Sequence, residues 1–188
     1  MPEKTAQKEP GKKPVPSKKP KPQQEVVVQI PLSELHPFPD HPFQVREDAS
    51  MQETAESVKE YGVLVPALAR PREDGGYELI AGHRRKHACE LAGLATMPVI
   101  VRDIDRDAAT IIMVDSNLQR ENILPSERAK AYKMKMEAIK RQGARTDLTS
   151  PKISAKFRSD DEVGQDAGVS GDTIRNYIAL TQLVPELQ

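Results

Sequence analysis

A cluster of cationic side chains near the middle of the chain could bind phosphate. The segment ELIAGHRRKHA, residues 78–88, passes from strand-like residues through a single glycine into a predicted helix start. Gly82 would place free backbone N–H groups and the positive end of the helix dipole beside the side chains that follow. Those side chains are His83, Arg84, Arg85, Lys86 and His87. They could supply the charge-assisted hydrogen bonds that a triphosphate requires, although a solvated cationic helix face would have the same composition.

A second polar segment lies at the end of a predicted apolar helix. The segment DSNLQREN, residues 115–122, contains an amide at Asn117 and a guanidinium at Arg120. Asn117 could help to coordinate a metal ion, and Arg120 could reach a phosphate or an acidic neighbour. A capped helix end is the simpler interpretation of the same residues.

The segment DDEVGQDAGVSGDTIRNYIAL, residues 160–180, has the pattern of a helix-turn-helix. Small Gly164 would allow two helices to cross closely, and Gly168 would allow a positive-φ turn between them. Ser170 is the predicted cap of the second helix. The predicted DNA-contacting residues are Ser170, Asp172, Thr173, Arg175 and Asn176.

Some side chains on this second helix favour DNA binding and one opposes it. Arginine and asparagine are well suited to the guanine and adenine edges in the major groove. Asp172 opposes binding, because a carboxylate near phosphates is repulsive unless it accepts a hydrogen bond from a cytosine amino group. An ordinary helical hairpin with a glycine-rich turn is the alternative.

Strands and helices are predicted to alternate between residues 25 and 122. Apolar patterning predicts strands at residues 26–30, 63–71, 77–82 and 96–104, and helices at residues 51–61, 84–91 and 105–117. Ser33 is expected to cap a brief helical turn, and Gly62 to end the first helix. The second and third strands, joined by EDGG, resemble a hairpin. The pattern predicts an α+β fold with one small mixed sheet.

Strand signals end after Leu124, which predicts an all-α region. Pro125 and a Ser126 cap would start a long helix, and Gly143 would end it. The apolar face of this helix is Ala129, Tyr132, Met136 and Ile139. Residues 144–159 are polar and basic, and are expected to form a connector before the helix-turn-helix.

Composition places the chain among proteins with modest aliphatic cores, since it has 188 residues, 37% hydrophobic residues, three Phe and no Trp. No apolar run approaches the roughly 20 residues that span a bilayer, and the single Cys89 cannot form an internal disulfide. We therefore expect a cytoplasmic protein.

Charge is distributed unevenly along the chain. Residues 1–24 hold seven Lys, two Glu and six Pro, which predicts a disordered basic arm. This arm either contacts DNA phosphates or acidic partners or acts as a solubilising tail. The predicted domains are therefore the arm at residues 1–24, a nucleotide-binding domain at residues 25–122 and a helical helix-turn-helix domain at residues 123–188.

The motifs resemble those of the ParB family of chromosome and plasmid partition proteins, in the expected order over residues 25–188. AGHRRKHA resembles the family's first phosphate motif, Gly-Glu-Arg-Arg-x-Arg-Ala. SNLQRENILPSERA looks like the second motif, Glu-Asn-x-x-Arg, with the helix that follows it. HPFQVR and YGVLVPALAR are similar to earlier segments of the family.

The resemblance implies a ParB/sulfiredoxin-like N-terminal domain and a mechanism. Proteins of this kind load at a centromere-like site on double-stranded DNA, bind CTP with Mg²⁺, and close into a dimeric clamp that slides along DNA. CTP hydrolysis then favours reopening, and a ParA-type ATPase moves the assembly. The implied localisation is cytoplasmic, on the nucleoid or a plasmid.

By matching position, the resemblance assigns the triphosphate to Gly82, Arg84 and Arg85, and it assigns Mg²⁺ to Asn117. The full set of expected nucleotide-binding residues is Arg46, Pro66, Gly82, His83, Arg84, Arg85, Asn117 and Arg120.

Departures from the family pattern bear on catalysis. His83 and Ser116 stand where the two motifs have Glu, so both carboxylates are absent. Their loss removes metal support and a catalytic contributor, for which Asp115 and Asn117 could compensate in part. We therefore expect nucleotide binding more readily than CTP hydrolysis, and the catalytic residues are unknown. Val65 replaces a frequent Gln in the segment near the base.

Other classes share this scaffold. A sulfiredoxin-like redox enzyme would need a cysteine where Gly82 stands, and Cys89 lies several residues further along. A nuclease or small-molecule kinase would need carboxylates near His83. A DNA-binding repressor with a vestigial nucleotide pocket is a further alternative. Family members also usually carry a C-terminal dimerisation region, so this chain would either lack it by truncation or dimerise through its N-terminal parts.

Overall fold

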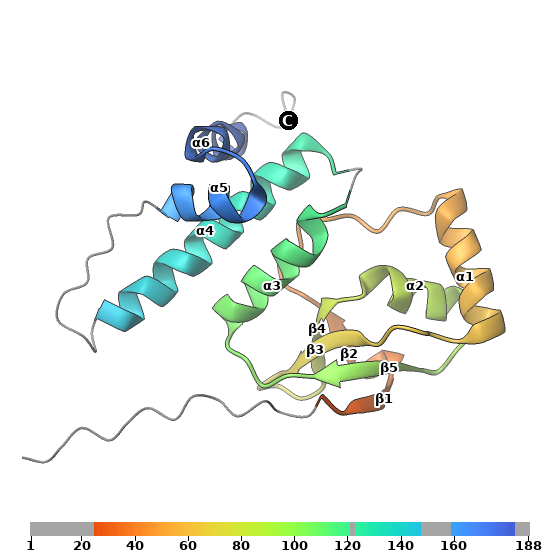
Figure 1. The fold of residues 1–188 in the computed structure, drawn as a ribbon. Helices are drawn as coiled ribbons and strands as arrows, with labels where there is room; N and C mark the ends of the chain where they lie inside the picture. The colour runs from red at the N-terminus through yellow and green to blue at the C-terminus, as the bar shows by residue number, and fades with distance from the viewer. Residues whose placement is uncertain (1–24, 121–122, 148–158, 183–188) are drawn as a thin grey trace, which may run out of the picture.

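Five strands form one mixed sheet in the computed structural model, which describes residues 25–120, 123–147 and 159–182 (Figure 1). The predicted arm at residues 1–24 and most of the predicted connector lie outside the described residues. The strands are β1 (Val27–Pro31), β2 (Leu35–Pro37), β3 (Ala67–Pro71), β4 (Tyr77–Ala81) and β5 (Thr96–Val101).

The strand order is β1-β5-β3-β4-β2. The β3–β4 pair is antiparallel and joined by a short turn, which confirms the predicted hairpin. The β1–β5 pair is also antiparallel. The β2–β4 and β3–β5 pairs are parallel. The predicted α+β class with a mixed sheet is therefore confirmed.

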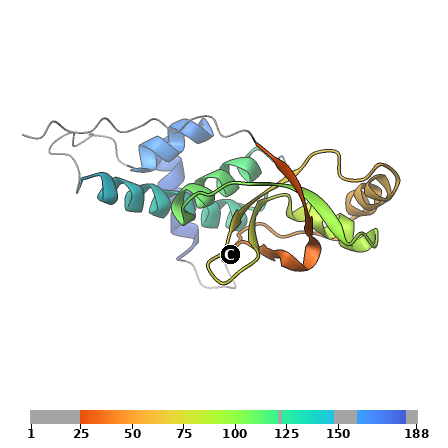
Figure 2. The same ribbon diagram turned by 90° about the horizontal axis from the view of Figure 1, so that it is seen from below.

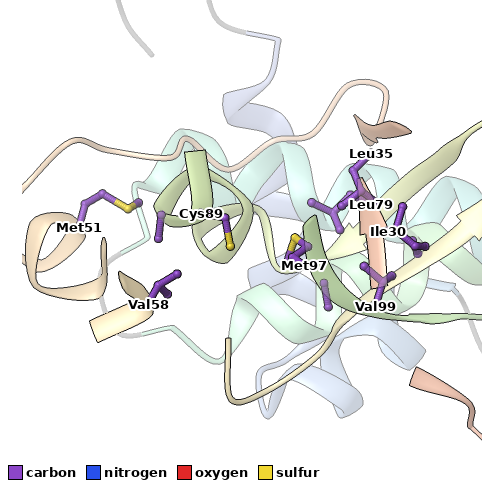
Figure 3. Packing of buried hydrophobic residues seen from close by; sticks show 11 residues of the cluster. Ile30, Leu35, Met51, Val58, Leu79, Cys89, Met97 and Val99 are labelled. Carbon is purple, nitrogen blue, oxygen red and sulfur yellow. The ribbon is translucent and has the colours of Figure 1, made fainter. Parts of the chain in front are cut away.

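Two helices cover one face of the sheet. Helix α1 (Ala49–Tyr61) is capped by the Asp48 side chain and ends at Gly62, as predicted, with φ 71°. Helix α2 (His83–Leu91) follows β4 through Gly82. Figure 3 shows the core beneath these helices, whose labelled side chains are Ile30, Leu35, Met51, Val58, Leu79, Cys89, Met97 and Val99.

Helix α3 (Arg106–Leu118) covers the opposite face of the sheet. Successive residues of a strand point to opposite faces, so neighbouring residues of β4 contact different helices. Leu79 of β4 lies in the core under α1 and α2, and the next residue, Ile80, packs against Met113 and Val114 of α3. Asp105 caps α3 by accepting a hydrogen bond from the backbone N–H of Ala108 at 2.8 Å.

Helix α4 (Pro125–Asp147) lies beside α3 in both views (Figures 1 and 2). Ala131 of α4 packs into the same cluster as Ile80 of the sheet. The boundary predicted at residue 122 therefore separates two segments that share a hydrophobic cluster. Within the described residues, no helix is long and apolar enough to cross a membrane.

Three predicted caps or ends were wrong. Ser33 lies inside the 3₁₀ turn Leu32–Glu34, and no side chain caps that turn. Ser126 lies inside α4, where the Glu127 side chain instead accepts the Leu124 N–H at 3.2 Å, as an acid at the third helical position often does. Helix α4 also continues through Gly143, since one helical glycine costs only about 1 kcal/mol.

Helices α5 (Ser159–Ala167) and α6 (Gly171–Leu180) form the predicted helix-turn-helix geometry. Gly168 in the turn has φ 68°. A Cβ at Gly164 would lie 2.6 Å from the Val169 carbonyl oxygen, so only glycine allows this close crossing. Val163 and Ile174 pack on Tyr132 of α4, which anchors the pair.

Lys135 of α4 joins these parts of the molecule. Its side chain is 1% exposed, and its ammonium group donates to Asp115 of α3 at 2.6 Å and to Asp166 of α5 at 2.9 Å. Burial alone would lower the pKa of Lys135, but the hydrogen bonds to both carboxylates raise it above its ordinary value. One buried cation therefore links three helices.

We expect Lys135→Met to lower the free energy of unfolding by about 1–3 kcal/mol. The loss stays moderate because Asp115 and Asp166 are 46% and 56% exposed and can be solvated once the cation is gone. Urea unfolding measures the change. Lys133→Met, at an exposed position of the same helix, is the control. Equal midpoints for the two variants would contradict the role given to Lys135.

Candidate functional site

The N-terminus of α2 is built around Gly82. This residue has φ 110°, and a Cβ added there would lie 2.9 Å from the Cβ of Ala67 on β3. Both the backbone conformation and the close approach of β3 therefore require glycine. The first turn of a helix leaves backbone N–H groups without intrahelical acceptors. The strand-to-helix junction predicted from the sequence is thus present and directs donors toward one point.

A cavity of about 210 Å³ lies at this junction. Three segments form it, namely the start of α2, the end of α3 and the loop before α1. The lining residues are His41, Phe43, Gln44, Val45, Ala81, Gly82, His83, Arg84, Arg85, Ser116, Asn117 and Arg120. All but two of the expected nucleotide-binding residues line this cavity, although they come from two motifs far apart in the sequence.

The two remaining residues lie close by. Arg46 lines an adjoining depression that shares Gln44, Arg84 and Arg120 with the cavity. Pro66 does not line the cavity, but its carbonyl oxygen accepts a hydrogen bond from Arg85 at 2.6 Å. The structure therefore brings the whole expected set to one region of the surface.

Two arginines of α2 connect the cavity with neighbouring segments. Arg84 donates to the Ser50 hydroxyl at 3.2 Å and lies 3.7 Å from Asp48, the cap of α1. Arg85 donates to the carbonyl oxygens of Val65 and Pro66. Burial lowers the pKa of Arg85, but a guanidinium remains protonated at neutral pH. A bound anion would compensate a positive charge that is partly desolvated here.

Two histidines face each other in the cavity. The rings of His41 and His83 have centroids 4.0 Å apart. Burial, with the nearby His41 and Lys86, lowers the pKa of His83 to about 3. Burial also lowers the pKa of His41. Both rings are therefore neutral at physiological pH.

The end of α3 supplies amide and hydroxyl groups. The Asn117 side-chain nitrogen donates to the Met113 carbonyl oxygen at 2.8 Å, which leaves the amide oxygen as the atom that can accept a donor or a cation. Asp115 was expected to compensate for the missing carboxylates, but it pairs with Lys135 and does not line the cavity. Among the described residues, no group of three His, Cys, Asp or Glu side chains could hold a metal.

Cys89 is buried in the core under α1 and α2, and burial raises the pKa of its thiol. A thiol in this state is a poor nucleophile. Its position agrees with the sequence argument against a sulfiredoxin-like reaction.

The expected DNA-contacting residues all lie at the start of α6. Ser170 caps this helix by accepting the Thr173 N–H at 3.2 Å, as predicted. Arg175 forms ion pairs with Asp160 of α5 and with Asp172. Asn176 is exposed. Thr173 and Asn176 could therefore contact DNA directly, whereas Arg175 would have to leave two carboxylates.

The helix pair carries a net negative charge. Residues 159–182 contain the single basic residue Arg175 and five acidic residues, Asp160, Asp161, Glu162, Asp166 and Asp172. Phosphate attraction, which supplies most of the non-specific affinity for DNA, is therefore weak at this pair taken alone.

Sequence reasoning missed His41 and Gln44 as members of the cavity. They lie in a proline-rich loop with no periodic pattern, and the Glu127 side chain holds this loop by accepting the Gln44 N–H at 3.1 Å. The signal available was the segment HPFQVR itself, which the family resemblance identified without assigning a role to its histidine.

Known proteins resemble this chain in sequence and in structure. The family described as the ParB N-terminal domain matches residues 16–118. The chromosome-partitioning protein Spo0J of Thermus thermophilus is 37% identical over 161 residues, which cover 85% of this chain and 52% of that protein. The chain spans about half the length of the curated relatives it matches.

Two crystal structures of one relative are also similar. The C-terminally truncated chromosome-partitioning protein ParB from Caulobacter crescentus, complexed to the centromeric parS site, is 28% identical with a TM-score of 0.55, and the match covers 86% of this chain and 75% of that one. The same protein complexed with CTP-gamma-S is 29% identical with a TM-score of 0.47, over 86% and 81% of the two chains.

The geometry at Gly82 predicts a strong local constraint. We expect Gly82→Ala to lower the free energy of unfolding by about 1–3 kcal/mol, because it adds backbone strain and a contact with β3. Gly75→Ala is the matched control, since Gly75 has φ 90° but a Cβ there meets nothing within 4 Å. Thermal or urea unfolding of both variants separates the two effects. If the two losses are equal, the close approach of β3 does not matter.

Proposed function

The chain belongs to the ParB family, and we propose that it is a DNA-partition protein in which a nucleotide pocket controls how the chain engages DNA. In this proposal the helix-turn-helix of α5 and α6 binds a centromere-like site on double-stranded DNA. CTP binds in the cavity at the start of α2 and closes a homodimeric clamp that slides along the DNA. A ParA-type ATPase moves the assembly, and the protein acts in the cytoplasm on a nucleoid or plasmid.

One observation carries the nucleotide part of the proposal. The two polar motifs, separated by about thirty residues of sequence, converge on a single cavity at a glycine-capped helix N-terminus. Helix N-termini and arginine side chains are the groups that proteins commonly use for phosphates. Arg84, Arg85 and Arg120 all line the cavity, and no Asp or Glu does so among the described residues. The charge and the donors both favour a polyphosphate.

The residues that line the cavity could hold Mg²⁺ only together with the phosphates of a bound nucleotide. Mg²⁺ commonly binds through one or two protein oxygens, with substrate phosphates and water completing its coordination. The Asn117 amide oxygen would be the protein ligand, because the amide nitrogen is already hydrogen bonded to Met113. Mg²⁺ would neutralise phosphate charge. His83 and Ser116 provide no carboxylate, so we propose that the chain binds CTP and hydrolyses it weakly at most.

The DNA part of the proposal rests on α5 and α6. Their glycine-dependent crossing and the Ser170 cap fix the start of α6 against α5, and Asp172, Arg175 and Asn176 remain exposed. Thr173 and Asn176 would contact base edges or phosphates, and Arg175 would exchange its carboxylate partners for a base. The Caulobacter relative, whose fold is similar over most of both chains, is complexed to the centromeric parS site, which supports DNA binding by this chain.

Arg84→Ala should weaken CTP binding by about ten- to a hundredfold, because it removes charge-assisted hydrogen bonds to phosphate. Calorimetric titration with CTP, ATP, GTP and UTP in the presence of Mg²⁺ measures affinity and base preference together. Arg72→Ala is the control, since Arg72 lies in the β3–β4 turn and does not line the cavity.

Initial DNA recognition, measured as site affinity without nucleotide, should be nearly unchanged in the Arg84 variant, since Arg84 lies on α2 and the proposed DNA-contacting helix is α6. Equal losses of CTP and DNA binding would argue against separate sites. If the unaltered protein binds no nucleotide, a repressor with a vestigial pocket becomes the better proposal.

Asn176→Ala should weaken binding to a specific DNA site by about 1–3 kcal/mol if its amide reads a base. Its exposed position predicts no change in thermal unfolding. Arg175→Ala should weaken DNA binding too, but it should also destabilise the fold, since Asp160 and Asp172 lose a shared cation. Fluorescence anisotropy and thermal melts measure the two quantities. Unchanged site affinity in both variants would remove α6 from base readout.

A further inference from the structure

The histidine pair in the cavity has two unsatisfied polar atoms. The Nε2 atoms of His41 and His83 are both buried, and within the described residues neither has a hydrogen-bond partner. The two rings are in contact, with centroids 4.0 Å apart and planes inclined by 46°, and both line the cavity. Buried nitrogens without partners are rare in native proteins, which suggests that a further proton on one ring completes the pair.

The orientation of His41 determines the role of its free nitrogen. Its Nδ1 atom lies 2.7 Å from the Phe43 carbonyl oxygen, which can only accept, so Nδ1 carries the proton. Nε2 of the neutral ring then carries a lone pair. His41 therefore carries an acceptor without a donor on the ring that contacts His83, and an added N–H on His83 could supply that donor.

The charges around the histidine pair favour an anion whose binding is accompanied by uptake of a proton. Lys86 of α2 and Arg120 after α3 are the cations that disfavour protonated histidine, and Glu127 of α4 is the carboxylate that acts in the opposite sense on His41. Arg84 and Arg85 also line the cavity. A phosphate chain would offset these positive charges and so remove the penalty for protonating the pair.

We propose that His41 and His83 form a phosphate subsite that binds the polyphosphate chain of a nucleotide together with one additional proton. His83, protonated at Nδ1 and Nε2, then donates to one acceptor in the pair and one on the phosphate chain. The proton comes from solvent and forms one N–H bond on the His83 ring, and no bond of the nucleotide changes. This inference rests on the proposed function, since it names the phosphate chain of a nucleotide as the ligand.

Nucleotide affinity should increase as the pH falls. In the empty site both rings are neutral near pH 7, because the pKa of His83 is about 3. If the bound phosphate raises the pKa of the pair, binding takes up a proton and affinity increases as the pH falls. The gain is at most about tenfold for each pH unit, and it disappears above the pKa of the bound state.

The test is calorimetric titration of the full chain with inorganic tripolyphosphate, CTP and UTP at several pH values from neutral downward, in buffers with different ionisation enthalpies. The dependence of the observed heat on the buffer gives the number of protons taken up. In the unaltered protein we expect proton uptake that increases toward one for each ligand as the pH is lowered, because the pKa of His83 in the empty site is about 3. We expect no uptake in His41→Gln or His83→Gln, and full uptake in the control His36→Gln, whose residue does not line the cavity.

Each other outcome has a distinct meaning. Nucleotide binding with heats that do not depend on the buffer would overturn the subsite and leave the proposed function intact. Uptake with CTP but not with tripolyphosphate or UTP would assign the proton to the cytosine ring and overturn the phosphate assignment. Uptake that survives in both cavity variants and is lost in His87→Gln would assign it to His87, which lies beside Glu47 and Glu90. No binding of any nucleotide would overturn the proposed function and the subsite together.

Discussion

The burial of one ammonium group between two carboxylates sets the position of three helices and, with the apolar cluster around Tyr132, holds the helix-turn-helix against the rest of the fold. Apolar contacts between helices tolerate small shifts, whereas a buried cation requires its partners at hydrogen-bond distance. Lys135 fixes α4 against Asp115 of α3 and Asp166 of α5. Because Asp115 precedes Ser116 and Asn117, the same helical turn that carries the ion pair also presents side chains to the cavity. The ion pair and one wall of the cavity therefore share a single turn of α3.

The shape of the cavity also depends on the backbone at Gly82. Gly82 allows β3 and the start of α2 to approach each other, and Arg85 then reaches the carbonyl oxygens of the Val65–Pro66 segment. Arg84 contacts the cap region of α1 in the same way. Both arginines thus bind protein acceptors in the structure. These contacts use only some of the five donors of each guanidinium group, so the remaining N–H groups stay available to an anion.

Much of the fold could be predicted because its signals are local. Apolar alternation and the glycines at positions 62 and 168 gave the strands, most helix ends and the turn of the helix-turn-helix. The cavity members Gly82, Arg84 and Asn117 were predicted because two recognisable motifs contain them. His41 was not predicted, since its role arises from a ring contact across 42 residues of sequence. The pairing of Asp115 with Lys135 was missed for a similar reason, because the direction of a side chain around a helix depends on tertiary packing.

The negative charge of the helix pair limits how this chain could recognise DNA. Backbone phosphates would be repelled by the five carboxylates of residues 159–182, so non-specific affinity must come from cations elsewhere in the chain. The pairing of Arg175 with Asp160 and Asp172 has a second consequence. A base edge must bind the Arg175 guanidinium more favourably than the two carboxylates do. Guanine presents two acceptors in the major groove and is therefore the base that can bind this group in a bidentate manner. Intramolecular pairing of this kind would penalise binding to non-cognate sequences more than to a cognate site, since only the cognate site replaces both lost hydrogen bonds. The acidic residues that weaken general affinity would in this way increase sequence selectivity.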